Sequence, residues 1–368
     1  MEHLLALPNV LVALTMVSLN AYVLFGGADF GGGVWDLLAT GDRRGRQREL
    51  ITHAIGPIWE ANHVWLVLVV VLLFTCFPPA FADLSIMLHI PLALMLIGIV
   101  LRGSAFTFRS YGSERNVSQR RWGRVFAIAS LGTPILLGIC IGAIASGQVG
   151  RAMEIDAGDS ATFQEIFVAP WLTPFSVGIG VLALALFAFL AAVYLTVEAS
   201  DEKLREDFRL RALWAGLAVF VAAFVVLTIA LATDTHIAAG LTRSAWAIPF
   251  HVATGIAAIW AIWALWTRRF HTARVAAAAQ VTLILWGWAL GQYPYMVPPT
   301  LTIETAAAPH RTLELTLWAL ALGALVLLPS LAYLFRLFKG RPGGFESMGE
   351  GRSRKQEAGS RKQKPPGR

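Results

Sequence analysis

Residues 56–77 read GPIWEANHVWLVLVVVLLFTCF, so a glutamate, an asparagine and a histidine open a stretch that is otherwise apolar. About 20 apolar residues are enough for a helix to cross the hydrocarbon of a membrane. A charged side chain at the centre of such a helix costs roughly 2.5–3.5 kcal/mol on insertion scales. We therefore expect Glu60 to lie near the membrane surface, to be paired, or to be retained for a task.

The composition of the whole chain is that of an integral membrane protein. Of its 368 residues, 56% are hydrophobic and 14% are charged, whereas soluble domains average about 25% charged residues. The net charge of +7 does not indicate nucleic-acid binding, because Lys and Arg occur in short blocks between apolar runs. That pattern is typical of loops that face anionic lipid. Cys76 and Cys140 lie in apolar runs, which excludes a disulfide framework.

The apolar runs predict an all-α fold with nine transmembrane helices in one domain over 1–339. The Gly-rich stretch after the first run is expected to extend that helix as far as Ala39. The segment 340–368 is basic and rich in Gly and Pro, which predicts a disordered tail. The predicted spans are 8–29, 57–77, 85–107, 125–147, 171–197, 212–233, 247–267, 275–293 and 313–338.

The connections between spans alternate in charge, which predicts the orientation of the chain. Basic connections stay in the cytoplasm, so the N-terminus is expected on the periplasmic side of a bacterial inner membrane and the C-terminal tail in the cytoplasm. An odd number of spans requires the same arrangement. The connections after spans one, three, five and seven hold 16 basic residues (Arg43, Arg44, Arg46, Arg48, Arg109, Arg115, Arg120, Arg121, Arg124, Lys203, Arg205, Arg209, Arg211, Arg268, Arg269, Arg274), and the other four connections hold 3 (Arg151, Arg243, Arg311).

Four ionisable residues of the first three spans fall towards the cytoplasmic side in this orientation. Asp29 ends the first span, and Arg102 lies near the end of the third. Glu60 and His63 open the second span. Mutual neutralisation of these charges would explain why a membrane tolerates them.

The spacing of Glu60 and His63 favours a proton relay. The two are three residues apart, so they share one face of a helix. Histidine titrates near neutral pH, and burial brings the proton affinity of a glutamate closer to that of histidine. The alternative is an inert charge cluster that sets helix register. For Arg102, a charge partner of the acids, we favour the structural role, because an arginine near a helix end can reach the surface.

Two further features bear on cofactors and partners. His89 and His251 could bind haem in principle, but no two histidines lie four residues apart, so we expect no haem or metal site in this chain. The segment GQYPYMVPPTLTIETAAAP at 291–309 contains prolines that prevent a helix, namely Pro294, Pro298 and Pro299. It predicts an ordered outer cap or a loop that faces a partner.

Four motifs in order carry a resemblance to a known family. They are GGADFGGGVWDL at 26–37, GPIWEANHVWL at 56–66, LRGSAFTFRS at 101–110 and YPYMVPPT at 293–300. Together they resemble subunit II of the cytochrome bd family of quinol oxidases. The length, the nine spans and the outward N-terminus also fit that family over the whole chain.

The resemblance implies a complex that oxidises membrane quinol and reduces dioxygen to water. It implies that the haems and the quinol-oxidising loop belong to a partner, subunit I, and that subunit II binds no haem. A structural quinone in subunit II, contacts with membrane lipid and a small accessory subunit are also compatible with it. Protons are expected to be drawn from the cytoplasm along a path that includes acids of subunit II, at the positions of Asp29 and Glu60.

The sequence also departs from the better-known members of the family. Position 60 is Glu rather than Asp, position 63 is His, and Gly26 stands where some members carry an aspartate. WEANHVWL at 59–66 is more similar to the branch called cyanide-insensitive oxidase. The residues alone leave open a proton-coupled secondary transporter and a purely structural subunit, although the one-sided acids fit a transporter poorly.

Overall fold

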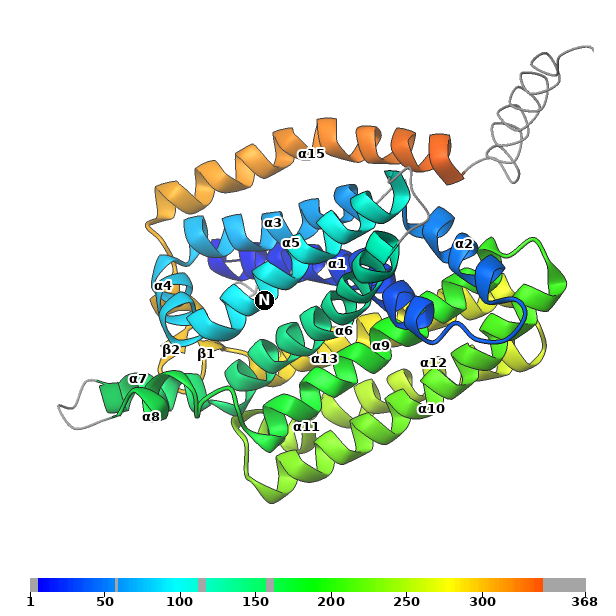
Figure 1. Cartoon of the computed structure of the whole chain (residues 1–368). Helices are drawn as coiled ribbons and strands as arrows, with labels where there is room; N and C mark the ends of the chain where they lie inside the picture. Colours follow the sequence, from blue (N-terminus) through cyan, green and yellow to red (C-terminus); the bar gives the residue numbers. More distant parts are fainter. Residues whose placement is uncertain (1–5, 57–58, 112–116, 157–161, 340–368) are drawn as a thin grey trace, which may run out of the picture. The chain divides into compact units, whose positions relative to one another are not determined.

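The computed structural model describes residues 6–56, 59–111, 117–156 and 162–339 (Figure 1). The tail predicted for 340–368 lies outside these residues. The chain divides into two compact units, Met1–Leu317 and Trp318–Arg368. The described part of the second unit is the continuation of helix α15 (His310–Lys339), which has Pro329 inside it.

Nine helices of the described residues are long and apolar enough to cross a membrane, which confirms the predicted all-α membrane fold. The first helix does continue through its Gly-rich stretch, and it ends at Leu37. The nine are α1 (Leu7–Leu37), α3 (Trp59–Cys76), α5 (His89–Tyr111), α6 (Val117–Ser146), α9 (Pro174–Glu198), α10 (Glu202–Ala232), α12 (Ala247–Trp266), α13 (Phe270–Gln292) and α15.

The largest error in the predicted spans is the start of the sixth. Helix α10 begins at Glu202 rather than at 212, because Asp201 caps it by accepting a hydrogen bond from the Lys203 amide at 2.8 Å. That bond holds the pKa of Asp201 below its usual value. A hydropathy pattern detects only the apolar part of a helix, so it misses this polar turn. Several basic residues assigned to a connection are therefore helical.

Short elements close the two ends of the first unit. Figure 1 shows α4, α7, α8 and the hairpin β1–β2 at one end and α2 at the other. Pro294, Pro298 and Pro299 stay outside helices as predicted, and β1 pairs antiparallel with β2. The elements are α2 (Arg44–Ile55), α4 (Pro78–Met87), α7 (Gln148–Asp156), α8 (Phe163–Phe167), α11 (His236–Arg243), β1 (Tyr295–Val297), β2 (Leu301–Thr302) and α14 (Ile303–Ala306).

The end formed by α2, the α9–α10 turn and the α12–α13 turn is here called the arginine-rich end. Asp207 of α10 accepts hydrogen bonds from Arg43 at 2.6 and 2.9 Å and from Gln47 at 2.9 Å. Arg211 donates to the Gln47 side chain at 2.8 Å. This network holds α2 against the polar first turns of α10, which precede the predicted start of that helix.

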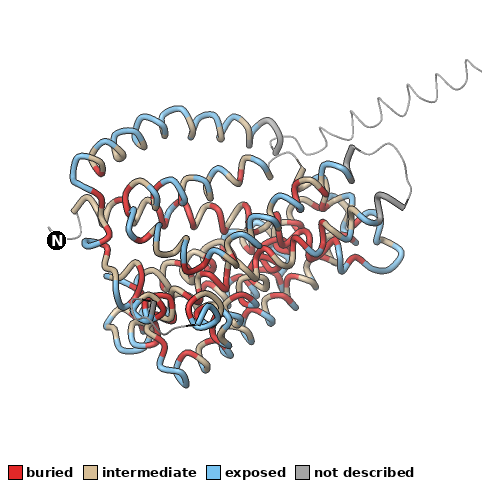
Figure 2. Tube along the Cα trace, turned by 60° about the vertical axis from the view of Figure 1, so that its left-hand side comes forward, coloured by how far each residue is buried: buried red, intermediate tan, exposed pale blue. Residues whose placement is uncertain are grey.

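The centre of the first unit is formed by α1, α6 and α9, whose apolar windows are the most buried of the nine. Figure 2 shows the buried residues concentrated along the middle of the unit. Small residues allow α1 to approach α9 closely: Gly27 faces the Phe187 ring, and a Cβ at Gly31 would overlap the Phe187 carbonyl. Backbone therefore touches backbone where α1 crosses α9.

Substitution at this crossing tests the packing. We expect Gly31→Ala to lower the stability of the assembled protein by about 1–3 kcal/mol, the usual cost of overpacking, measured as a fall in the thermal unfolding midpoint. Gly132→Ala, inside α6 with no atom within 4 Å of an added Cβ, is the matched control and should not lower the midpoint. Equal unfolding midpoints for the two variants would contradict the close packing of α1 against α9 at Gly31.

Candidate functional site

A buried carboxylate lies where α1 packs against α3. Asp29 is 6% exposed, and its Oδ2 accepts a hydrogen bond of 2.7 Å from the Asn62 side-chain amide. Asn62 is itself buried, on the same stripe of α3 as Val69 and Leu72. The amide donor therefore stabilises negative charge on Asp29 in surroundings that offer little water.

A buried arginine lies beside this carboxylate. Arg102 of α5 is 2% exposed, and its guanidinium interacts electrostatically with Asp29 and Tyr22. The guanidinium carbon is 4.5 Å from the Phe30 ring centroid and 5.5 Å from that of Phe126. Two aromatic faces and one carboxylate thus stabilise the charge of the buried guanidinium. The expectation that Arg102 reaches the surface is wrong, because this interior site holds it.

His63 is half-buried among aromatic rings. Its ring centroid lies 5.8 Å from that of Tyr22, 6.2 Å from that of Phe30 and 6.0 Å from that of Trp59. The positive charge of Arg102 also acts on this imidazole. The structure therefore brings Asp29, His63 and Arg102 together around Phe30.

Glu60 lies apart from these residues. Its side chain is exposed on this chain, although it is only one helical turn before His63. The partial burial expected of Glu60 is thus absent, and Asn62 occupies the buried position instead. The four predicted residues thus form a group of three, in which Asp29 and Arg102 are buried and His63 is half-buried, and a separate exposed carboxylate at the start of α3.

Sequence reasoning missed the roles of Asn62, Tyr22 and Phe126. The signal for Asn62 was its spacing of seven residues from Val69, which repeats the helical period. Helix α3 is apolar on nearly all sides, however, so its buried side cannot be recognised from hydrophobicity. Tyr22 and Phe126 come from other helices, and no local pattern ties them to Arg102.

The described residues show no group of three or more His, Cys, Asp or Glu that could hold a metal ion. His251 is exposed on α12. His89 is also exposed, and its Nδ1 lies 2.8 Å from the Ile86 carbonyl oxygen. The site holds a negative and a positive charge side by side in the protein interior.

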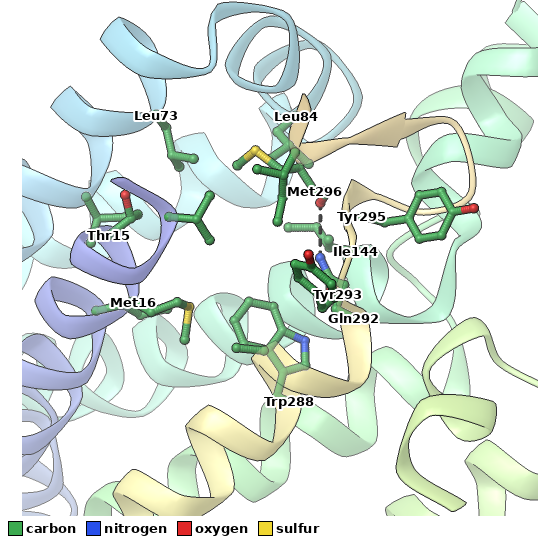
Figure 3. A pocket seen from close by; sticks show the side chains of 15 residues that line it. Thr15, Met16, Leu73, Leu84, Ile144, Trp288, Gln292, Tyr293, Tyr295 and Met296 are labelled. Carbon is green, nitrogen blue, oxygen red and sulfur yellow. Dashed lines mark hydrogen bonds between the residues drawn. The ribbon is translucent and has the colours of Figure 1, made fainter. Parts of the chain in front are cut away.

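An apolar pocket of about 160 Å³ lies towards the other end of the first unit (Figure 3). Helices α1, α3 and α13 and the hairpin line it, with Met16 and Leu73 across from Trp288. Gln292 donates its amide to the Met296 carbonyl at 3.0 Å. The Gln292 Oε1 and the Trp288 Nε1 are buried without a hydrogen-bond partner among the described residues.

The family model for cytochrome bd terminal oxidase subunit II matches residues 7–338. This chain belongs to that family. It is subunit II of a bd-type quinol oxidase, and the alternative of a secondary transporter is not favoured. Membership implies a haem-bearing subunit I as partner and a bacterial inner membrane as location.

Individual relatives agree with the family. The chain is 21% identical over 323 residues to a putative cytochrome bd menaquinol oxidase subunit II of Bacillus subtilis, covering 86% of this chain and 91% of the relative. It is 31% identical over 115 residues to the cytochrome bd ubiquinol oxidase subunit 2 of the same organism, which is 30% of this chain and 31% of the relative. The bd oxidase structure from Geobacillus thermodenitrificans has the same fold, with a TM-score of 0.75, 22% identity, and coverage of 91% of this chain and 99% of that chain.

The hydrogen bond to Asp29 gives a prediction for subunit II in its complex. Asn62→Ala leaves the buried carboxylate without its amide donor. We therefore expect the free energy of unfolding to fall by about 1–3 kcal/mol, measured as a lower unfolding midpoint of the purified oxidase. Val64→Ala, at an exposed position of the same helix, is the control and should change the midpoint little. A midpoint of Asn62→Ala at or above that of the control would show that the bond does not stabilise the site.

Proposed function

We propose that this subunit takes up protons for the oxidase at its arginine-rich end, through Glu60, His63 and Asp29. The observation that carries the proposal is that the first turn of α3 places the exposed Glu60 close to Asn62, whose side chain binds the buried Asp29 of α1. Reduction of dioxygen to water consumes protons, so a complex that performs it needs a polar path across an apolar protein. Buried ionisable residues in membrane helices commonly mark such paths.

Each residue has a distinct part in this path. Glu60 exchanges protons at the exposed surface, where its carboxylate is accessible on this chain. His63 lies one turn further along α3, and its imidazole has one nitrogen that can accept a proton and one that can donate. Asp29 holds a proton-accepting oxygen inside the protein, with its negative charge supported by Asn62 and Arg102.

Arg102 acts as a positioning residue in the proposal. Its Nε and Nη2 are buried without a hydrogen-bond partner among the described residues. Buried donors of this kind are normally satisfied by ordered water. Water held by these two nitrogens beside Asp29 would connect the carboxylate to neighbouring polar groups, and the stacking on Phe30 keeps the guanidinium in place.

The orientation of the chain forms part of the proposal. The distribution of 16 basic residues against 3 supports a cytoplasmic arginine-rich end, with the N-terminus on the periplasmic side. In that orientation α2 and the turn before α10 face the cytoplasm. The ionisable residues of α1, α3 and α5 then lie on the side from which protons are drawn.

We further propose that the pocket of Figure 3 holds the ring of a structural quinone. A cavity of about 150 Å³ accommodates a benzene molecule, so the volume suits one six-membered ring. The Trp288 N–H can donate to a quinone oxygen, and the Gln292 Oε1 can accept from the hydroxyl of the reduced form. Met16, Leu73 and Ile144 offer apolar contact on the other sides.

The first test of the proposal is Glu60→Gln, which removes the acid and keeps the shape. We expect oxygen consumption to fall by at least about tenfold, because positioned acids and bases contribute 10²–10⁴-fold to rates limited by proton transfer. Haem content per protein should stay the same. Glu49→Gln, an exposed acid of α2, is the matched control and should retain full turnover.

Two results of that experiment would contradict the path. Unchanged turnover in Glu60→Gln would remove Glu60 from it. A loss of activity that follows the loss of haem would indicate a purely structural subunit, which is the alternative that the sequence left open.

The pocket has its own test in Trp288→Phe, which removes the indole N–H but keeps an aromatic ring. We expect at least a severalfold drop in quinone per complex, since one buried hydrogen bond contributes about 0.5–1.5 kcal/mol. Extraction and chromatography of the purified oxidase measure this content. Trp286→Phe on the same helix, outside the pocket lining, is the control. Unchanged quinone in Trp288→Phe, or equal loss in both variants, would refute the assignment.

A further inference from the structure

A polar cavity of about 260 Å³ lies at the arginine-rich end, where α9 ends and α12 turns into α13. Three arginines and a histidine line it: Arg205 from α10, Arg268 and Arg269 from the turn before α13, and His271 from the first turn of α13. None of the described residues that line this cavity is acidic. Its wall is therefore strongly basic.

Among the described residues, the carboxylate that neutralises Arg268 is shared with a second arginine. Glu206 accepts two hydrogen bonds of 2.9 Å from the Arg209 Nε, which lies outside the cavity lining. Arg268 reaches the same carboxylate at a distance of 3.6 Å, with 65% of its side chain exposed. One carboxylate thus serves two guanidinium groups, and positive charge remains on the cavity side.

Arg205 has a hydrogen-bond donor that the described chain does not satisfy. Its Nη2 donates to the Ala199 carbonyl at 2.7 Å, and its guanidinium carbon lies 5.6 Å from the Phe270 ring centroid. These contacts fix the side chain at the cavity wall. Its Nε is buried without a partner, and an anionic oxygen is the acceptor that satisfies a guanidinium N–H best.

The backbone adds donors of the same kind. Helix α13 is 23 residues long, and its N-cap residue, Arg269, makes no side-chain cap hydrogen bond. The Ala273 amide donates to the Arg269 carbonyl at 2.9 Å, so the amides of 270–272 precede the first intrahelical bond. Those residues line the cavity, and the positive end of the helix dipole points there.

We propose that this cavity binds a phosphate group, carried either by the headgroup of an anionic phospholipid or by a small soluble phosphate ester. Phosphate presents several strong acceptors, which match the forked donors of arginine and the free amides of a helix end. Trp266, the last residue of α12, is 72% exposed, and tryptophan is enriched at the depth of lipid headgroups. This inference is independent of the proton path and of the quinone pocket.

The test uses the purified oxidase complex in a neutral detergent and measures its unfolding midpoint. The probes are phosphatidylglycerol, phosphatidylcholine, glycerol 3-phosphate, and sodium chloride at matched ionic strength. Ligand that binds the folded state raises the midpoint in a concentration-dependent way. We expect phosphatidylglycerol, glycerol 3-phosphate or both to raise the midpoint above the level reached with phosphatidylcholine and salt.

Variants locate the effect. In Arg269→Gln the half-saturating probe concentration should rise roughly tenfold, the size expected from the loss of one charge-assisted hydrogen bond. Arg205→Gln should act in the same direction. Arg269 is exposed, so its variant remains informative if Arg205→Gln fails to fold. Arg44→Gln, an exposed arginine of α2 outside the cavity, should stay close to the unsubstituted protein.

The two phosphate probes distinguish a lipid headgroup from a soluble phosphate ester. A response to phosphatidylglycerol alone identifies a lipid headgroup, and a response to glycerol 3-phosphate in detergent alone identifies a soluble ester. The proposal is overturned if neither probe exceeds phosphatidylcholine and salt, if Arg269→Gln keeps the original half-saturating concentration, or if Arg44→Gln shifts it equally. The last result would indicate diffuse surface charge rather than a site.

Discussion

A carboxylate inside an apolar helix bundle is tolerated only where other groups replace the water it has lost, and this constraint organises the first unit of the protein. Asp29 obtains one hydrogen bond from Asn62 and the charge of Arg102. These two partners come from α3 and α5, so the Asp29 side chain connects three helices. Aromatic rings from α1 and α6 then hold the arginine. Breaking a buried pair of this kind typically costs about 3–5 kcal/mol.

The same arrangement separates surface from interior along a short length of α3. Glu60 is exposed, His63 is half-buried, and Asn62 lies against the buried carboxylate. Solvent exposure thus falls from Glu60 to Asn62 within one helical turn. The subunit thus combines a rigid charged core with an accessible acid, and both belong to the part of the molecule that the family motifs cover.

Much of this organisation follows from the sequence, and the limits are physical. Long apolar runs predict spans because hydrocarbon admits few other structures, and nine long apolar helices of the described residues correspond to them. The rotation of α3 could not be predicted, because an all-round apolar helix has no polar face to mark its exposed side. For that reason Asn62 was missed and Glu60 was expected to be partly buried. The polar first turns of α10 were missed because hydropathy responds only to the apolar part of a helix.

The contact between Gly31 and α9 has a consequence for the acid two positions earlier. At Gly31 only a hydrogen atom separates the backbone of α1 from the Phe187 carbonyl, so α1 has almost no freedom to slide or roll on its neighbour. The packing of the α1 backbone against the α9 backbone therefore fixes the direction of the Asp29 carboxylate. A homologue with a larger residue at position 31 must pack α1 differently against α9. The angle of the hydrogen bond between Asp29 and Asn62 then changes as well.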